Sequence, residues 1–154
     1  MQEKILVRII AGSKSDLKFV EITEQVLQEY EIGFDSFISS AHRNPEKTYS
    51  LALEAEAEGI QVIIAMAGMA ASLPGVVASK TTLPVIGVPL PGSDLNGLDA
   101  LYSIVQMPSG IPIATMGIGK AGAKNAAFMA MSILSLQNPE IKQQLLNYRE
   151  SWKN

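Results

Sequence analysis

The sequence predicts an α/β fold in which a parallel sheet is covered by helices on both faces. Segments with strand character and segments with helical character alternate five times along the 154 residues. The strand-like segments are continuous apolar runs, without the alternation of apolar and polar residues that a half-exposed sheet would show. Buried parallel strands separated by helices are typical of one α/β domain, and we expect a single domain over residues 1–154.

Five short apolar runs are the expected strands, because a run of this kind between turn signals is typical of a fully buried strand. The first contains Ile5, Leu6 and Val7 and leads into Gly12 and Ser13, as a buried strand entering a tight loop would. In chain order, the expected strands are residues 4–10, 34–39, 61–66, 84–88 and 112–116.

Helical spacing and capping signals predict the helices that follow these strands. Asn-Pro pairs at residues 44–45 and 138–139 each supply an N-cap and a proline at the first helical position. Gly33 is expected to stop the first helix, and Gly59 the second. The expected helices are residues 16–31, 45–58, 70–80, 98–105, 121–136 and 139–152.

Composition excludes several classes of function. The chain carries 12 Lys and Arg against 15 Asp and Glu, so it lacks the basic surplus that holds a nucleic-acid backbone, and no nucleic-acid partner is expected. It has no cysteine and one histidine, which removes disulfides, thiolate chemistry and any multi-histidine metal site within one chain. The charged start of the chain does not resemble a signal peptide, and we expect a cytoplasmic protein.

Charge is sparse over one long stretch of the chain, residues 59–139, and residues 59–79 carry none at all. The charge-free part is long enough to raise the question of a membrane span, but glycines, a proline and polar residues interrupt it, so we expect none. A domain of this size cannot hide so much uncharged surface in its own core. We therefore expect a large interface between subunits, with the terminal helix 139–152 packed on a neighbour. The charged residues of the stretch are Lys80, Asp94, Asp99, Lys120 and Lys124.

The loops after the strands should carry the function, because ligands of open parallel sheets bind beyond the carboxyl ends of the strands. Residues 12–16, Gly-Ser-Lys-Ser-Asp, open a helix and suit an anion, although the serines could simply cap that helix. Residues 117–122 have the spacing G-x-G-x-x-G. No further strand with an acidic end follows them, so we expect backbone contact with a substrate, or close packing, in place of dinucleotide binding.

The loop after the second strand holds the only histidine of the chain. Residues 39–45 read Ser-Ser-Ala-His-Arg-Asn-Pro and join a strand end to a helix start. An imidazole is the side chain best suited to moving protons near neutral pH, and the guanidinium of Arg43 offers a planar fork for a phosphate or a carboxylate. We therefore expect His42 to be catalytic, with a structural role as the alternative.

These loops resemble the signature loops of the N5-carboxyaminoimidazole ribonucleotide mutase family (PurE) of purine biosynthesis. The matching segments are residues 12–16, 40–45, 101–115 and 119–126, and the resemblance covers almost the whole chain in the same order. It implies a flavodoxin-like three-layer α/β/α sandwich with a five-stranded parallel sheet and a C-terminal helix. It also implies a homo-octamer that needs no metal and no organic cofactor.

The family moves a carboxylate from the exocyclic nitrogen of a carboxylated aminoimidazole ribonucleotide to a ring carbon, by decarboxylation and trapping of CO2. The resemblance assigns the proton transfers to His42, and the phosphate and ribose contacts to Ser13, Asp16 and Arg43. Because a carboxylate would repel the phosphate, we expect Asp16 to bind ribose hydroxyls. The other substrate contacts that the resemblance implies are Gly12, Ser15, Ser40, Ala41, Gly68, Ala70, Ala71 and Leu73.

The chain departs from the family's pattern at three positions. Leu17 stands where the family usually has a tryptophan, and Met69 and Ser72 stand where a glycine and a histidine are common. Arg43 and Pro45 resemble the mutase branch more than the branch that carboxylates aminoimidazole ribonucleotide with free CO2. That carboxylase, and a non-catalytic nucleotide-binding protein of the same fold, are the alternatives.

Overall fold

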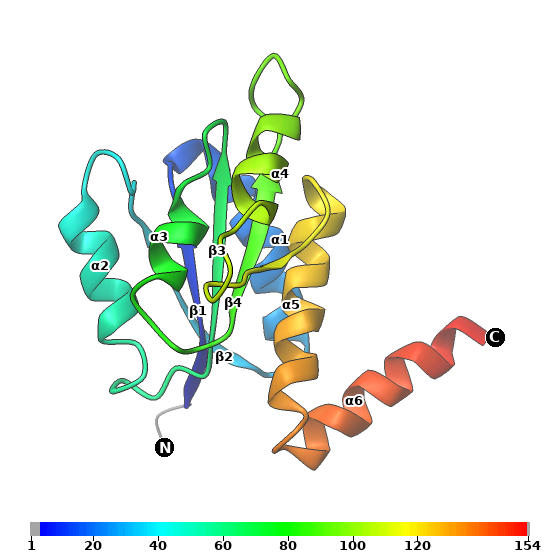
Figure 1. Ribbon diagram of the computed structural model, residues 1–154. Helices are drawn as coiled ribbons and strands as arrows, with labels where there is room; N and C mark the ends of the chain where they lie inside the picture. Colours follow the sequence, from blue (N-terminus) through cyan, green and yellow to red (C-terminus); the bar gives the residue numbers. More distant parts are fainter. Residues whose placement is uncertain (1–3, 154) are drawn as a thin grey trace.

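The computed structural model describes residues 4–153 and contains a five-stranded sheet with helices on both faces (Figure 1). The strand order is β2-β1-β3-β4-β5, and every neighbouring pair of strands is parallel. This is the flavodoxin-like order, so the predicted fold class is confirmed. The strands are β1 Ile5–Ala11, β2 Gly33–Ile38, β3 Val62–Gly68, β4 Val85–Leu90 and β5 Ala114–Thr115.

The helices form the two outer layers of the sandwich. One apolar cluster joins the sheet to α1 and α5, and a second joins its other face to α2, α3 and α4. Neighbouring residues of β1 divide between them, since Ile9 faces the first cluster and Ile10 the second. The helices are α1 Leu17–Glu29, α2 Pro45–Leu53, α3 Leu73–Ala78, α4 Leu98–Val105, α5 Lys120–Leu134 and α6 Pro139–Glu150, with 3-10 turns at Lys14–Asp16 and Ser151–Lys153.

The predicted helix starts are confirmed by their caps. The Asn44 side chain accepts a hydrogen bond from the Lys47 N–H at 3.3 Å, and the Asn138 side chain accepts one from the Glu140 N–H at 3.0 Å. Some lengths differ from the prediction. Helix α2 ends at residue 53, where residue 58 was expected, and α3 begins at residue 73, where residue 70 was expected. Strand β5 has two residues where 112–116 were expected, because it lies at the sheet edge and Pro112 has no N–H for pairing.

Gly33 does not stop the first helix, and that prediction was wrong. The chain leaves α1 through Glu31, which has a φ of +56°, and the N–H of Ile32 returns to the carbonyl of Leu27. Gly33 is instead the first residue of β2, where a Cβ would lie 2.3 Å from the carbonyl oxygen of Lys4. Glycine is needed there because two strand backbones approach closely.

An ion cluster around the buried side chain of Arg8 ties β1 to its neighbours. The Arg8 guanidinium bonds Asp35 on β2 at 2.6 Å, the carboxylate of Glu58, and the carbonyl of Leu51 at 3.0 Å. Burial by itself would lower the pKa of Arg8, but the two carboxylates outweigh it and raise that pKa above its ordinary value. The buried guanidinium therefore has an ionic partner on β2 and another in the segment after α2.

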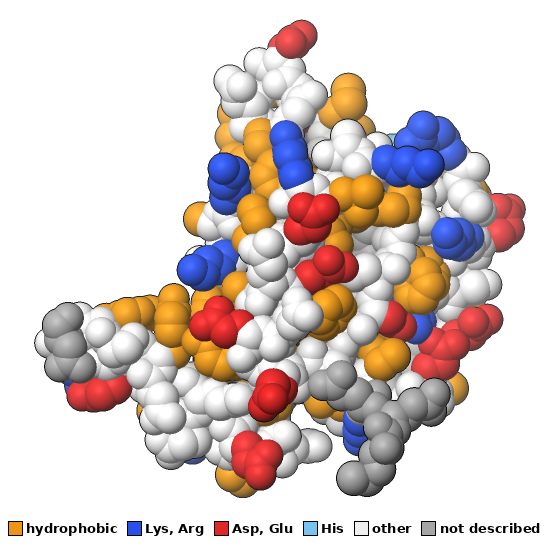
Figure 2. Space-filling view, turned by 180° about the vertical axis from the view of Figure 1, so that it is seen from behind, with side chains coloured by type: hydrophobic (Ala, Val, Ile, Leu, Met, Phe, Trp, Pro, Cys, Tyr) orange, Lys and Arg blue, Asp and Glu red, His pale blue; other side chains and the backbone are white. Residues whose placement is uncertain are grey.

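Helix α6 packs on α5 and extends away from the rest of the domain (Figure 1). Its only buried residue is Ile141, whereas Leu146 in its last turns is 53% exposed and Trp152, in the 3-10 turn that follows, is 66% exposed. Figure 2 shows orange side chains along this helix and in the angle between it and the body. Packing of residues 139–152 on a neighbouring subunit stays a prediction. Among the helices of residues 4–153, none is long and apolar enough to cross a membrane.

Candidate active site

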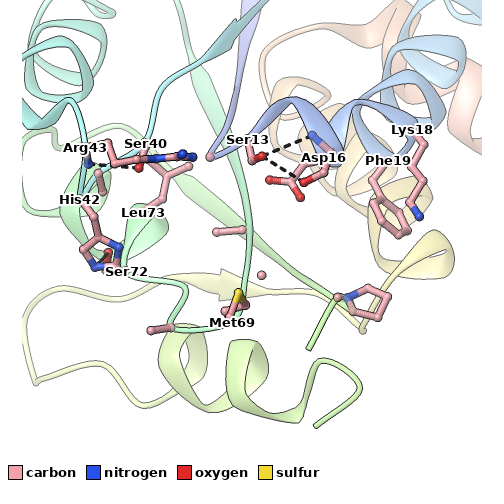
Figure 3. Close-up of a pocket in the computed structure, with 18 residues that line it drawn as sticks. Ser13, Asp16, Lys18, Phe19, Ser40, His42, Arg43, Met69, Ser72 and Leu73 are labelled. Carbon is pink, nitrogen blue, oxygen red and sulfur yellow. Dashed lines mark hydrogen bonds between the residues drawn. The ribbon is translucent and has the colours of Figure 1, made fainter. Parts of the chain in front are cut away.

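A pocket of about 620 Å³ opens at the carboxyl edge of the sheet. The loops after β1, β2 and β3 line it, and Pro91 and Gly92 after β4 complete it (Figure 3). The central strand of these is β1, which pairs with β2 on one side and β3 on the other. The pocket therefore lies where the strand order reverses, which is the usual ligand site of such sheets.

Eleven of the twelve residues that the sequence singled out line this pocket. The exception is Ala71, which is 1% exposed and belongs to the apolar cluster behind the loop. The residues in the pocket wall are Gly12, Ser13, Ser15, Asp16, Ser40, Ala41, His42, Arg43, Gly68, Ala70 and Leu73.

Seven further residues of the wall were not among those predicted as contacts. Met69 and Ser72 had been noted only as departures from the family pattern. Pro91 and Gly92 follow β4, so the rule that loops after strands carry the site could have found them. The wall residues that were missed are Lys18, Phe19, Ala67, Met69, Ser72, Pro91 and Gly92.

The G-x-G-x-x-G segment, residues 117–122, does not line the pocket. A Cβ on Gly122 would lie 1.6 Å from the carbonyl oxygen of Gly117. Gly122 therefore allows the start of α5 to pack directly on the preceding loop, which is the close packing that the sequence offered as one alternative.

The loop after β1 is ordered by its own serines. The Ser13 hydroxyl accepts a hydrogen bond from the Ser15 N–H at 3.3 Å and lies 3.0 Å from the Ser15 hydroxyl. Next to them, burial raises the pKa of the Asp16 carboxyl, against the opposing effects of a backbone hydrogen bond at Ser13 and the charge of Lys18. The loop thus presents two hydroxyls and one partly buried carboxyl group to the pocket.

The loop after β2 exposes an imidazole and a guanidinium. The Asn44 N–H donates to the Ser40 carbonyl at 2.8 Å, and the Arg43 N–H donates to the Ser40 hydroxyl at 3.2 Å. The side chains of His42 and Arg43 remain exposed, and Arg43 forms no ion pair within residues 4–153. Figure 3 shows the Arg43 side chain running toward the loop that carries Ser13. A cation without a protein partner suits an anionic ligand.

The loop after β3 forms a further part of the pocket wall and contacts the loop that carries His42. Met69 has a φ of +56°, and its side chain is 62% exposed at the pocket wall. That left-handed backbone explains why a glycine is common at this position, since only glycine adopts it without strain. Three residues further on, the Ser72 hydroxyl lies 3.0 Å from Nε2 of His42.

These features define a class of protein: a flavodoxin-like α/β domain whose pocket, at the carboxyl edge of the sheet, brings a guanidinium without an ion-pair partner in residues 4–153 next to an imidazole. The comparisons identify the family. The chain belongs to the AIR carboxylase family, whose model matches residues 6–154. Within residues 4–153, no group of three or more acidic or histidine side chains that could hold a metal ion is present.

Relatives and solved structures of similar sequence agree with this family. The chain is 54% identical over 147 residues to the N5-carboxyaminoimidazole ribonucleotide mutase of Pyrococcus abyssi, covering 96% of this chain and 83% of that one. It is 48% identical over 145 residues to the mutase of the same name from Escherichia coli strain K12, covering 94% and 86%. The crystal structure of Treponema denticola PurE matches with a TM-score of 0.86 at 35% identity, covering 95% and 90%.

Proposed function

We propose that this chain is an N5-carboxyaminoimidazole ribonucleotide mutase of de novo purine biosynthesis. It converts N5-carboxyaminoimidazole ribonucleotide into 4-carboxy-5-aminoimidazole ribonucleotide, and the reaction is an isomerisation. The observation that carries the proposal is that the only histidine shares one pocket with Arg43 and the 12–16 loop, in a chain about half identical to relatives named as this mutase.

The phosphoribosyl end of the substrate binds between the first two loops. The Arg43 guanidinium, which has no ion-pair partner in the described chain, takes the phosphate. The hydroxyls of Ser13 and Ser15 and the backbone at Gly12 and Ser40 complete this end of the site. Asp16 binds ribose hydroxyls, because a carboxylate accepts their hydrogen bonds but would repel a phosphate.

His42 moves the two protons that the reaction requires. In the first half, the bond between the exocyclic nitrogen and the carboxylate breaks, CO2 leaves, and the nitrogen takes a proton from the imidazolium. In the second half, the ring carbon attacks CO2 and forms the new carbon–carbon bond. The proton on that carbon then passes to the neutral imidazole, which restores the imidazolium for the next turnover.

Small apolar residues hold the CO2 between the two halves. Ala41, Gly68, Ala70 and Leu73 line the pocket around the proton carrier and offer no hydrogen bonds from their side chains. An apolar wall of this kind offers CO2 a surface without hydrogen-bonding side chains.

Two substrates separate the proposal from its alternatives. Purified protein is assayed with N5-carboxyaminoimidazole ribonucleotide, and separately with aminoimidazole ribonucleotide plus bicarbonate. We expect rapid turnover of the first and little of the second. Preferential turnover of the second would identify a carboxylase that uses free CO2, and no turnover of either would identify a non-catalytic nucleotide-binding protein.

The chain assembles into a homo-octamer in this proposal. Large apolar side chains remain exposed on α4 and α6, among them Leu98, Tyr102 and Val105 on α4. Light scattering at micromolar concentration should show the octamer, and a stable monomer would contradict it. Truncation after Asn138 should weaken the assembly, whereas removal of residues 153–154 alone should not. A cytoplasmic location and independence from metal and organic cofactors stay predictions.

A further inference from the structure

We infer that Ser72 is the residue that positions His42 for proton transfer. Its hydroxyl accepts a hydrogen bond from Nε2–H of the imidazole, and Nδ1 is therefore the nitrogen that gives and takes the proton. The part of this inference that concerns turnover rests on the proposed function. The hydrogen bond itself does not, and it can be tested on the protein without substrate.

The contact joins two loops that are distant in the sequence. His42 lies in the loop after β2, and Ser72 lies 30 residues further on, directly before α3. The Ser72 hydroxyl is 3.0 Å from Nε2, and both residues line the pocket (Figure 3). Within residues 4–153, Nδ1 has no hydrogen-bond partner, which leaves it available to a ligand.

The hydroxyl of Ser72 is not occupied as a helix cap. A capping serine has an extended backbone and accepts a hydrogen bond from the N–H of the second or third helical residue. Ser72 instead has helical angles, φ −75° and ψ −18°, and makes no such bond. The second residue of α3 is Pro74, which has no N–H to donate. The contact with His42 is therefore the one side-chain hydrogen bond that Ser72 makes within the described chain.

The contact is compatible with either ring tautomer, and only the Nε2–H form leaves the Nδ1 lone pair free to take a proton, which is why we infer that form. When Nε2–H donates to Ser72, the neutral imidazole carries its lone pair on Nδ1, and the imidazolium carries the transferable proton there. The proton passes from Nδ1 to the exocyclic nitrogen as CO2 leaves, and the proton of the ring carbon later returns to Nδ1. The proton on Nε2 stays in place throughout.

A neutral partner suits a residue that must act as acid and then as base. A carboxylate beside the ring would favour the imidazolium, and an ammonium group would favour the neutral form. A hydroxyl can accept the Nε2–H hydrogen bond from the neutral imidazole and from the imidazolium alike. The charged groups that share the pocket with His42 are Asp16, Lys18 and Arg43, and none of them hydrogen-bonds the imidazole in the described chain.

The first test uses the fact that the chain has one histidine. In protein labelled with 15N, the shifts of the two ring nitrogens report which one carries the proton in the neutral form. We expect the Nε2–H tautomer alone in the wild type, and a measurable fraction of the Nδ1–H tautomer in Ser72→Ala. Ser79→Ala is the matched control, because the Ser79 hydroxyl bonds the Val76 carbonyl within its own segment of chain. A wild-type protein with the Nδ1–H tautomer would overturn the inference.

The second test is kinetic. Ser72→Ala should lower kcat about tenfold and leave KM within about twofold, since the ring loses its orientation while the phosphoribosyl contacts remain. Ser72→Thr keeps a hydroxyl and should restore most of the loss. A wild-type kcat in Ser72→Ala would overturn the positioning role. If the wild type turns over neither substrate, the proposed function fails, while the tautomer measurement still decides whether the hydrogen bond exists.

Discussion

Replacing Arg43 with alanine should weaken substrate binding without slowing the chemistry. The side chain is exposed and forms no ion pair within residues 4–153, so its removal leaves no protein charge without a partner. The loop keeps its shape, because the hydrogen bond from Arg43 to the Ser40 hydroxyl comes from the backbone N–H. The expected change in unfolding free energy is therefore within about 0.5 kcal/mol.

The size of the binding effect follows from the contact that is lost. A hydrogen bond to a charged group contributes about 1.5–3 kcal/mol, which corresponds to a rise in KM of roughly 10- to 150-fold. The phosphate is remote from the reacting atoms and is held equally in the ground and transition states, so kcat should stay near the wild-type value. Steady-state kinetics with N5-carboxyaminoimidazole ribonucleotide measure both constants.

A second variant, Arg43→Lys, separates the effect of the charge from that of the planar guanidinium. Arg43→Lys keeps the charge but loses the planar fork, so its KM should fall between those of the wild type and Arg43→Ala. An unchanged KM in Arg43→Ala would refute the assignment of this residue to the phosphate. A large fall in kcat with unchanged KM would instead place Arg43 at the reacting end of the substrate.

Three further predictions concern Asp16 and Gly12 in the pocket wall and the ion cluster around Arg8. Burial raises the pKa of the Asp16 carboxyl, so the folded state binds more protons at this group than the unfolded state does. The contribution of Asp16 to stability therefore falls as the pH rises from the ordinary carboxyl pKa through the raised one. Asp16→Asn should remove this pH dependence of the unfolding free energy, measured with urea, and should be no less stable than the wild type at pH 7. Its KM should rise roughly tenfold. Lower stability of the variant at pH 7 would contradict this prediction. Gly12→Ala places a methyl group 3.8 Å from the Asp16 carboxylate without overlap, so the urea midpoint should stay unchanged while KM rises. An unchanged KM would show that the substrate does not contact this part of the pocket wall. Arg8→Met removes the cationic partner of Asp35, which is partly buried, and of Glu58, which is about half exposed, and should cost about 1.5–3 kcal/mol of unfolding free energy; a loss below about 1 kcal/mol would show that the cluster matters little.

The sequence was sufficient for the fold class and for most of the pocket because both depend on patterns along the chain. Continuous apolar runs separated by helices predict a parallel sheet, and such a sheet brings the loops after its strands to one edge. That rule alone places His42 near the 12–16 loop and near Gly68.

The differences from the sequence prediction arise where tertiary contacts override a local signal. Gly33 looked like a helix stop, but the close approach of the carbonyl of Lys4, the residue before β1, is what requires a glycine there. Ala71 sits among predicted contacts in the sequence, yet its side chain turns into the core. The contact between Ser72 and His42 depends on two side chains in separate loops, and no spacing in a single sequence reports it.

The central claim is that His42 carries the protons of the reaction. General acid–base catalysis of this kind typically contributes 10²–10⁴-fold, so His42→Asn should lower kcat at least about a hundredfold. The variant should keep the wild-type oligomeric state by light scattering and bind the ribonucleotide with nearly wild-type affinity by calorimetry, because the phosphoribosyl contacts come from other residues. The decisive measurement is kcat of His42→Asn with N5-carboxyaminoimidazole ribonucleotide at saturation. A fall of a hundredfold or more is the predicted result, and a wild-type kcat would contradict the account.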